Sequence, residues 1–377
     1  MIAFGILLLI FSAVYASFIF WCFIGWKLID VVPYSSNKEF PGVTVIVPVR
    51  NEERTIAVSL QALVQQDYPK HKIEILVVDD HSDDKTTVVV NEFIRNNPGN
   101  GIRLIEMATN EFGSKKSAIT KAVSEARFEI ILTTDGDCIV PVSWIRTFVH
   151  AYQESDIEFV AGPVAFHSGA GLLGSFQALE MLGLVGIAAA GIRMGNPMMC
   201  NGANISYTKA AFVRVNGFES LKQHASGDDT QLLLKIAKQD KSKVVFLKQE
   251  DSIVLGTPVH SLSQLWQQRK RWASKIPVAL TPFTISVAVI SWFTHALLVL
   301  NAVLCIWFPG ILFYFFSALL LKLISEFLLL NSLSTFFQRK ALLWLFVPAQ
   351  AFYWVYITLI GIRAPFGKYH WKGRRVR

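Results

Sequence analysis

The chain has 377 residues, of which 52% are hydrophobic and 17% charged, and its mean hydropathy is +0.40. An average soluble domain has about 25% charged residues, so this composition excludes a purely soluble protein, a disordered chain and a small disulfide scaffold. The formal net charge of +8 lies wholly in residues 276–377, which hold nine Lys/Arg and one acid. Residues 1–275 have no net charge, which argues against a nucleic-acid-binding surface on that part of the chain.

The first segment of the chain is apolar. Residues 2–26 carry no charge, and these 25 positions form a helix long enough to cross a bilayer core of about 30 Å. Lys27 follows the apolar run and no basic residue precedes it. This arrangement favours a retained membrane anchor over residues 1–27, with its N-terminus outside, over a cleaved signal peptide.

Residues 40–260 alternate short β-branched runs with amphipathic stretches. The predicted strands are 44–47, 73–78, 102–106 and 129–133, and the predicted helices are 53–66, 86–96 and 115–126. Strands that are apolar throughout and separated by helices predict an α/β fold with a mostly parallel sheet covered on both faces. Ligands of such sheets bind beyond the carboxyl ends of the strands.

Polar runs follow three of these strands. They read PVRNEE at 48–53, DDHSDD at 79–84 and DGD at 135–137. One such run by itself is typical of a turn or a helix cap. Three at one edge of a sheet indicate a ligand site.

The third run has the chemistry of a cation site. Asp135 and Asp137 are close enough in sequence to share a hard divalent cation, which takes one or two carboxylates together with phosphate oxygens. With Lys116 at the start of the preceding helix, the pattern predicts a nucleoside-diphosphate site. Asp79 and Asp80 suit the base and ribose of such a donor, since carboxylates accept hydrogen bonds from N–H and hydroxyl groups.

Two later motifs each have a structural and a functional interpretation. Asp228 and Asp229, in the run SGDDT, open a predicted helix, where they cap its N-terminus and could also supply a catalytic base. The basic and aromatic run QQRKRW at 267–272 lies in a predicted interfacial segment, 261–282. It either anchors the chain at the membrane surface or takes part in binding.

The C-terminal part is predicted to hold about three more transmembrane helices, at 283–306, 310–330 and 341–362, followed by a basic tail, 363–377. If residues 40–260 are cytosolic, three crossings leave the tail outside, against the positive-inside tendency. Either the tail is an exception or the last segment is re-entrant. Lys322 and Glu326, four residues apart, are expected to pair, and His295 to face a neighbouring helix.

The order of these motifs resembles the family 2 glycosyltransferases, in particular the membrane-embedded branch that includes cellulose, chitin and hyaluronan synthases and ceramide glucosyltransferase. The resemblance covers about residues 42–275. It rests on VPVRNEE at 47–53, VVDDHSDD at 77–84, Asp135-Gly136-Asp137, Gly227-Asp228-Asp229 and the Q-x-x-R-W pattern of Gln268, Arg271 and Trp272.

The resemblance implies a GT-A fold and an inverting transfer from a nucleotide sugar, usually a UDP-sugar. It makes Asp229 the catalytic base and Asp137, with Asp135, the ligand of Mg²⁺ or Mn²⁺. The donor-binding residues it implies are Pro48, Arg50, Glu52, Asp80, Lys116, Asp135, Gln268 and Arg271. The acceptor-binding residues it implies are Asn201, Gly202, Asp228 and Trp272.

The sequence is consistent with two classes of acceptor. The small number of helices favours a lipid or lipid-linked glycan acceptor, whereas the Q-x-x-R-W pattern is frequent in processive polysaccharide synthases. A nucleotide-binding membrane protein without catalysis is a further alternative. Asp229 and Arg271 argue against it, because nucleotide binding alone does not require a base beyond the phosphates. A nucleotidyltransferase is disfavoured because the run after the first strand has no glycine. We expect an integral membrane protein, in the plasma or inner membrane if bacterial, whose catalytic domain faces the cytosol.

Overall fold

The computed structural model describes residues 1–31, 40–108, 114–154, 156–167, 171–218, 227–273, 281–363, 369–371 and 374–376. The chain divides into two compact units. The α/β unit comprises Ile29–His167, Met199–Thr257 and His370–Arg377, and the helical unit comprises Met1–Leu28, Ser168–Met198 and Pro258–Tyr369.

The α/β unit follows the strand and helix order expected from the sequence. Its strands are β1 (Val43–Val49), β2 (Ile73–Asp79), β3 (Ile102–Glu106), β4 (Ile130–Thr133), β5 (Phe159–Ala161), β6 (Val164–Phe166), β7 (Ile205–Thr208), β8 (Val244–Phe246) and β9 (Val254–Gly256). Its helices are α2 (Ile56–Val64), α3 (Thr86–Asn96), α4 (Lys115–Glu125), α5 (Trp144–Glu154), α7 (Lys209–Arg214) and α8 (Asp228–Gln239). A strand pair, β10 (Tyr369–Trp371) and β11 (Arg374–Val376), lies near the C-terminus.

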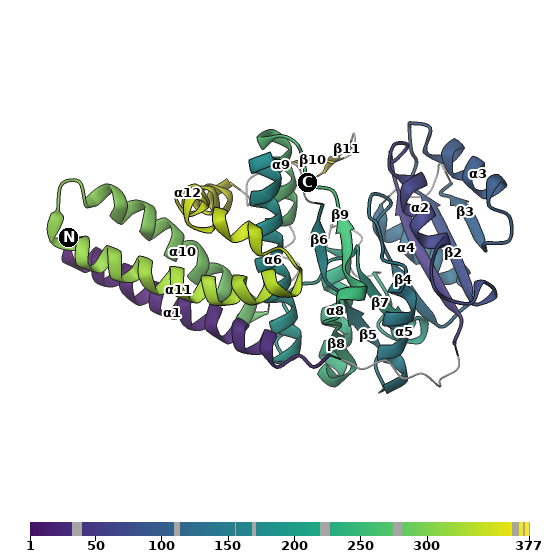
Figure 1. The fold of residues 1–377 in the computed structure, drawn as a ribbon, viewed down its shortest axis with the longest axis horizontal. Coiled ribbons are helices and arrows are strands. Elements are labelled where there is room, and N and C mark those ends of the chain that lie inside the picture. Colours follow the sequence, from purple (N-terminus) through teal and green to yellow (C-terminus); the bar gives the residue numbers. More distant parts are fainter. Residues whose placement is uncertain are drawn as a thin grey trace. The chain divides into compact units, whose positions relative to one another are not determined.

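Seven of the strands form one sheet in the order β3-β2-β1-β4-β7-β5-β8 (Figure 1). The four strands predicted from the sequence form its parallel half, and β7 is antiparallel to both of its neighbours. The chain leaves β1 toward β2 and β3 and later returns to the other side of β1 with β4. The strand order therefore reverses between β1 and β4, which is where open α/β sheets bind their ligands.

Both faces of β1 are covered, which explains its unbroken apolar sequence. On one face its valines at 43, 45, 47 and 49 enter a core with α2 and α5, represented by Leu60 and Phe148. On the other face β1 contacts α4. Because each face is buried, the strand cannot alternate polar and apolar residues as a strand with one wet face does.

Asn204 is a buried junction between segments distant in the sequence. Its Oδ1 accepts a hydrogen bond from Trp144 Nε1 at 2.8 Å, and its Nδ2 donates to the carbonyl oxygens of Pro163 and Ser252 at 2.7 and 2.8 Å. All of these groups are shielded from water, so each would be left unsatisfied without the amide. Asn204 thus holds α5 and the turns next to β6 and β9 together.

Asn204→Ala is expected to lower the free energy of unfolding by about 2–3 kcal/mol, because it orphans a buried donor and two acceptors. The change is measured by denaturant unfolding of the purified full-length protein, followed by tryptophan fluorescence. Asn201→Ala is the matched control, since the Asn201 side chain accepts one bond, from Ala203 N, and is only half-buried. An equal loss in the two variants would contradict the junction role.

The helical unit contains five helices that are long and apolar enough to cross a membrane. These candidate spans are Ile2–Lys27, Gly171–Arg193, Pro282–Leu304, Pro309–Phe336 and Lys340–Arg363. The α-helices are α1 (Ile2–Lys27), α6 (Gly171–Arg193), α9 (Leu262–Ala273), α10 (Pro282–Leu304), α11 (Leu312–Phe336) and α12 (Phe346–Arg363). Short 3₁₀ turns precede α11, at Pro309–Ile311, and α12, at Lys340–Leu345.

Helix α1 packs along α11 and α10 (Figure 1). Gly5 lies against Tyr314, where an added Cβ would come within 2.9 Å, and Trp26 stacks edge-on with Phe336. The contacts between α1 and α11 follow the same order along both helices, so the two helices run parallel. Thr294 of α10 instead donates to the carbonyl of Phe11. With Phe283 of α10 against Trp21, α10 runs antiparallel to α1.

The structure differs from the sequence analysis at residues 171–193. These residues were included in the α/β domain at 40–260, but they form α6, which groups with the helical unit. The segment escaped notice because it contains Glu180 and many small residues, which lower its hydropathy to 1.6, against 2.5 for α1. Its glycines serve close packing: a Cβ on Gly186 would come within 2.6 Å of Leu333.

The predicted C-terminal helices are present with shifted bounds. The first begins at Pro282, capped by Thr281, whose hydroxyl accepts from Thr284 N at 3.1 Å. The second, predicted to end at 330, continues to Phe336, and residues 331–336 contain no glycine or proline that would end it. Most of the predicted tail, 363–377, and residues 274–280 of the interfacial segment lie outside the described residues.

Candidate functional site

The ladder between β1 and β4 ends before the ladder between β1 and β2. β1 pairs with β2 as far as Val49 but with β4 only from Val43 to Ile46. Pro48 lies beyond the last pair with β4, at a position where its missing N–H breaks no bond with that strand. The polar runs after β1 and β4 therefore start where the two strands are no longer joined.

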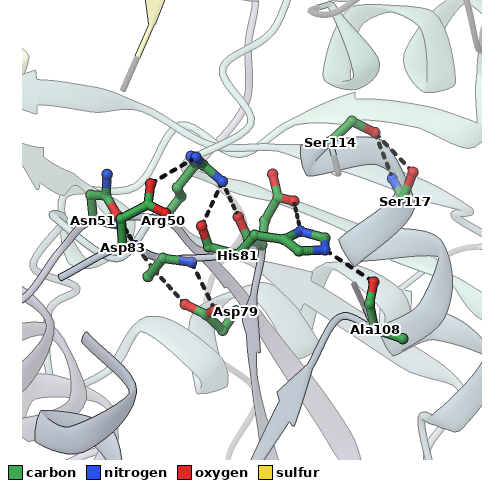
Figure 2. Close-up of polar contacts among 10 residues, drawn as sticks. Arg50, Asn51, Asp79, His81, Asp83, Ala108, Ser114 and Ser117 are labelled. Carbon is green, nitrogen blue, oxygen red and sulfur yellow. Dashed lines mark hydrogen bonds and ion pairs between the residues drawn. The ribbon is translucent and has the colours of Figure 1, made fainter. Parts of the chain in front are cut away.

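Arg50 ties the loop after β1 to the loop after β2 (Figure 2). One guanidinium nitrogen, Nη1, donates to the carbonyl oxygens of Asp80 at 2.6 Å and His81 at 2.7 Å. The other, Nη2, pairs with the Asp83 carboxylate at 3.2 Å. The Arg50 side chain is buried, so these bonds to a charged donor are stronger than surface ones.

Two residues in these loops adopt left-handed backbone angles. Asn51 has φ of 53° and His81 has φ of 57°, a region that residues other than glycine adopt uncommonly, although asparagine and histidine enter it more often than most. His81 is held there by both ring nitrogens, one 3.1 Å from Asp80 Oδ1 and the other 3.0 Å from the carbonyl oxygen of Ala108 (Figure 2). Such overdetermined strain is typical of a ligand site.

The two aspartates at the end of β2 have different surroundings. Asp79 accepts from the backbone N–H of Ser82 at 3.0 Å and from its hydroxyl, so its carboxylate closes the loop (Figure 2). Asp80 is also buried, and its carboxylate contacts the His81 ring. Asp79, predicted to bind the donor, therefore already has a local structural role.

Asp84 fastens the same loops from their outer side. Its carboxylate accepts from Thr86 N at 3.0 Å and from Glu53 N at 3.1 Å. Thr86 in turn accepts from Glu52 N at 2.8 Å, and the Glu52 carboxylate accepts from Thr55. Partial desolvation raises the pKa of Asp84, but the hydrogen bonds from Thr86 and Glu53 outweigh it and hold the pKa below its ordinary value.

Asp84→Ala is expected to destabilise the protein by about 1 kcal/mol near neutral pH through loss of its hydrogen bonds from Thr86 N and Glu53 N. The folded pKa lies below the ordinary 3.8, so the stabilising effect is complete above pH 3.8 and disappears as the pH falls through the folded value. Melting temperatures of wild type and variant should converge on acidification. Asp83→Ala, whose side chain is 78% exposed, should show a smaller effect. A difference independent of pH would contradict this role.

The Asp135-Gly136-Asp137 run brings its carboxylates together. Ligand atoms of Asp135, Asp137 and Cys138 all lie within 4.8 Å of one another. Gly136 fits closely under β1, since a Cβ there would come within 2.7 Å of Val49 Cγ1, and its carbonyl accepts from the Ser59 hydroxyl. Burial, with the charges of Asp135 and Asp137, raises the pKa of the Cys138 thiol well above its usual range. The cluster thus offers a hard cation two carboxylates and a neutral thiol.

Lys115 pairs with this cluster. Its Nζ lies 2.5 Å from Asp135 Oδ1. Lys116, the residue singled out in the sequence, is buried and points its Nζ toward Gln231 Oε1 of α8, at 3.4 Å. The two lysines lie on adjacent positions of the first helical turn, about 100° apart, so they reach different partners.

Asp229 joins the same edge of the sheet from α8. Its Oδ2 accepts from Gly202 N at 2.9 Å, and its Oδ1 accepts from Thr230 N at 2.8 Å. A Cβ built on Gly202 would lie 3.3 Å from Asp229 Cβ and 3.4 Å from Lys115 Nζ. Gly202 is therefore the contact between Asp229 and the lysine that pairs with Asp135.

For the other predicted acceptor residues the structure shows only local contacts or the backbone position. Asn201 is half-buried and its Oδ1 accepts from Ala203 N at 3.1 Å. Asp228 is the first residue of α8, and its side chain is outside the described part of the chain. The helix start itself requires glycine, because Gly227 has φ of 92°.

The Q-x-x-R-W residues lie on α9 in the helical unit. Gln268, Arg271 and Trp272 are half-buried, whereas the intervening Arg269 is 4% exposed. Arg269 forms an ion pair with Glu180 of α6, donates to Gln268 Oε1 and lies 3.9 Å from the Trp272 ring centroid. Tyr356 of α12 also donates to Glu180, at 3.3 Å. Arg269 and Glu180 thus fix α9 against α6, a role that the motif pattern did not reveal.

Comparison with known proteins gives the family. The sequence profile of glycosyl transferase family 21 matches residues 5–377, nearly the whole chain. The chain belongs to glycosyl transferase family 21. The resemblance to membrane-embedded glycosyltransferases that the motifs indicated is confirmed.

Two curated relatives are similar over part of the chain. A poly-β-1,6-N-acetyl-D-glucosamine synthase from Staphylococcus epidermidis is 22% identical over 245 residues, which are 63% of this chain and 55% of that protein. A β-monoglucosyldiacylglycerol synthase from Synechocystis is 27% identical over 115 residues, 30% of this chain and 24% of that protein. The chain thus spans from a quarter to just over half of the length of these relatives.

One solved structure is similar over almost the whole length. The mannosyltransferase PcManGT from Pyrobaculum calidifontis, in complex with GDP-Man and Mn²⁺, superposes with a TM-score of 0.62 at 20% identity, covering 97% of this chain and 98% of that one. At this identity the likeness shows the fold. The GT-A fold with apolar helices at both ends, predicted from the sequence, is therefore confirmed.

Proposed function

We propose that this family 21 member is an inverting, divalent-metal-dependent glycosyltransferase that moves a sugar from a nucleotide-sugar donor to a membrane-bound acceptor. The observation that carries the proposal is the contact series at the sheet edge. Asp229 binds the backbone of Gly202, Gly202 adjoins Lys115, and Lys115 pairs with Asp135. A carboxylate able to take a proton and a cluster able to hold a diphosphate thus belong to one site.

The Asp135 and Asp137 carboxylates fit Mg²⁺ or Mn²⁺. Both ions prefer oxygen ligands, and two carboxylates together with the oxygens of a diphosphate supply them. When bound, the cation would neutralise charge on the donor diphosphate. The Mn²⁺ in the complex of PcManGT supports this assignment.

The loops after β1 and β2 are the proposed nucleoside site. Arg50 fixes the backbone of Asp80 and His81, so the Asp80 carboxylate is presented in one orientation. Pro48 and Glu52 flank this arginine in sequence, and Asp79 completes the same loop. We assign these residues to the base and ribose of a UDP-sugar, the donor usual in proteins that the motifs resemble.

The proposed reaction is a single displacement. An acceptor hydroxyl oxygen attacks the anomeric carbon, its proton passes to a carboxylate oxygen of Asp229, and the bond from the anomeric carbon to the diphosphate oxygen breaks. The electron pair leaves with the nucleoside diphosphate, whose charge Lys115 and Lys116 help to balance. One carboxylate base gives inversion, whereas retention would need a second carboxylate as nucleophile.

The remaining assignments rest on the motifs. Gln268 and Arg271 are proposed to bind the donor diphosphate and Trp272 to stack on the acceptor, with Asn201, Gly202 and Asp228 also on the acceptor side. The catalytic unit is proposed to face the cytosol, where nucleotide sugars are made. Lys27, which directly follows the uncharged residues 2–26, supports that orientation.

The acceptor is proposed to be a lipid or a lipid-linked glycan, because the described spans are few. A processive polysaccharide synthase is the second candidate, favoured by the poly-β-1,6-N-acetyl-D-glucosamine synthase that matches over 245 residues. The length of the product separates the two. A product with one added sugar supports the first and a polymer supports the second.

Asp229→Asn is expected to reduce turnover by about 10²- to 10⁴-fold, since the amide cannot take the acceptor proton. Donor affinity should stay close to that of wild type. The measurement is release of nucleoside diphosphate by the purified protein with Mn²⁺ and membrane lipids, across a panel of UDP- and GDP-sugars, beside calorimetric donor binding. Substantial residual transfer by the variant would exclude Asp229 as the base, and donor binding without turnover by wild type would favour a nucleotide-binding protein.

Asp137→Asn is expected to weaken Mn²⁺-dependent donor binding by about tenfold or more. Calorimetric titration of the donor with and without Mn²⁺ measures the effect. Cys138→Ala is the control, because Mg²⁺ and Mn²⁺ prefer carboxylate oxygens to sulfur as ligands. Equal losses in the two variants, or donor binding indifferent to the metal, would contradict the proposed cation site.

A further inference from the structure

Two buried ion pairs lie among the described residues of the helical unit. Lys322 and Glu326, 2.8 Å apart, pair within α11, as their spacing of four residues indicated. Arg269 of α9 and Glu180 of α6 pair between two helices, and their side chains are 5% and 7% exposed. Helical spacing explains the first pair but gives no reason for the second.

Helix α6 holds the segment of α9 at two points. Gln177, 0% exposed, donates from Nε2 to the Val259 carbonyl at 2.9 Å and accepts from Val259 N at 3.0 Å, just before α9 begins. Three residues further along α6, Glu180 Oε2 accepts from Arg269 Nε at 3.1 Å and from its Nη2. Glu180 Oε1 accepts from the Tyr356 hydroxyl of α12 at 3.3 Å. Both carboxylate oxygens are thus engaged, and two nitrogens of the guanidinium are held.

The rest of the Arg269 guanidinium contacts the Q-x-x-R-W residues. Its Nη1 donates to Gln268 Oε1, and its central carbon lies over the Trp272 ring, 3.9 Å from the ring centroid. At that distance the guanidinium covers one face of the indole. Only the opposite face of Trp272 remains for stacking on a ligand. The Gln268 amide has its oxygen turned toward Arg269, so its nitrogen remains as the group that can donate to a ligand.

Stability alone does not account for an arginine at this position. Apolar side chains of similar volume are often as stabilising as a buried ion pair, because the pair must first lose its hydration. Leu265, one turn earlier on α9, packs in a cluster with Phe176 of α6 and Tyr356 of α12 without any charge. A guanidinium, in contrast, is planar and carries donors in fixed directions, so it can stack on a ring and bond an amide at once.

We propose that Arg269 is a positioning residue of the transfer reaction, which directs one face of Trp272 to the acceptor and the amide nitrogen of Gln268 to the donor diphosphate. Glu180 holds Arg269 in the place that this requires. The inference rests on the proposed function, which assigns Trp272 and Gln268 to those ligands. Arg269 acts through these two side chains and not by contact with a ligand. Without it, the ring and the amide must be ordered when the ligands bind, which weakens binding.

The first test replaces the ion pair by apolar side chains of similar size. In Glu180→Leu/Arg269→Met the helices keep a buried contact, so the melting temperature of the full-length protein should stay within a few degrees of wild type. The KM for the acceptor, supplied as total membrane lipid extract, should rise about tenfold and the KM for the nucleotide sugar about threefold, while kcat changes less. Lys270→Met, in the same basic run and half-buried, is the matched control and should keep all three values.

The alternative is that Arg269 serves only to hold the helices together. Such a role would lower the melting temperature or the active fraction, and with it kcat, and would leave both KM values unchanged. That result, or an equal rise of KM in Lys270→Met, overturns the inference. If the double variant does not fold, Arg269→Lys takes its place, because lysine can keep the ion pair with Glu180 but not the planar contact with Trp272. A rise of the acceptor KM in Arg269→Lys then supports the inference, and an unchanged KM overturns it.

A double-mutant cycle tests whether Arg269 acts through Trp272. Trp272→Leu removes the ring, so adding Arg269→Lys to that variant should raise the acceptor KM by less than about twofold. A rise of about tenfold in both backgrounds is the additive result expected of two residues that act independently. Additivity would therefore overturn the positioning role.

A signal that needs no turnover separates this inference from the proposed function. The chain has ten tryptophans, and with 5-fluorotryptophan incorporated the resonance of Trp272 is the one absent from Trp272→Phe. That resonance is expected to shift in Arg269→Lys and not in Lys270→Met. If wild type transfers sugar but the resonance and both KM values are unchanged in Arg269→Lys, the function stands and the positioning role fails. If wild type transfers no sugar from any donor, the proposed function fails, and the role of Arg269 in transfer fails with it.

Discussion

The early end of the pairing between β1 and β4 is the constraint on which the site depends. Backbone groups that are hydrogen-bonded in a ladder are closed to a ligand, and β1 stays bonded to β2 through Val49 while it leaves β4 after Ile46. The chain reverses its direction across the sheet at the same place. Every polar run that the sequence places after β1, β2 and β4 is delivered to this edge, where backbone and side chains are available for binding.

Around that opening the charged side chains mainly bind backbone and hydroxyl groups of the loops themselves. Arg50 holds two backbone carbonyls, Asp79 closes its own loop and Asp84 fastens two loops together. These bonds fix the loops before any ligand arrives, so less conformational entropy is lost on binding. The left-handed backbone of His81 shows that the loops are held in a shape they would not adopt in isolation.

The sequence predicted the parallel half of the sheet because β1, β2 and β4 are buried on both faces and its helices are amphipathic. It singled out Lys116 and passed over Lys115, which pairs with Asp135, because the directions of adjacent helical side chains depend on how α4 packs. It also passed over Glu180 and α6, since a charged residue in a run of small residues lowers hydropathy. The sequence also did not identify Arg269, because nothing in the basic run 267–272 distinguishes the arginine that is buried from its half-buried neighbours.

The parallel packing of α1 and α11 has a consequence for how the protein is made. The Tyr15 hydroxyl finds its partner Glu326 only 311 residues later. At about 5–20 residues per second, the ribosome needs on the order of 15–60 s to supply that partner. Until then Gly5 and Tyr15 of α1 lack their partners Tyr314 and Glu326 on α11, so this face of the first helix stays uncovered through most of the synthesis of the chain.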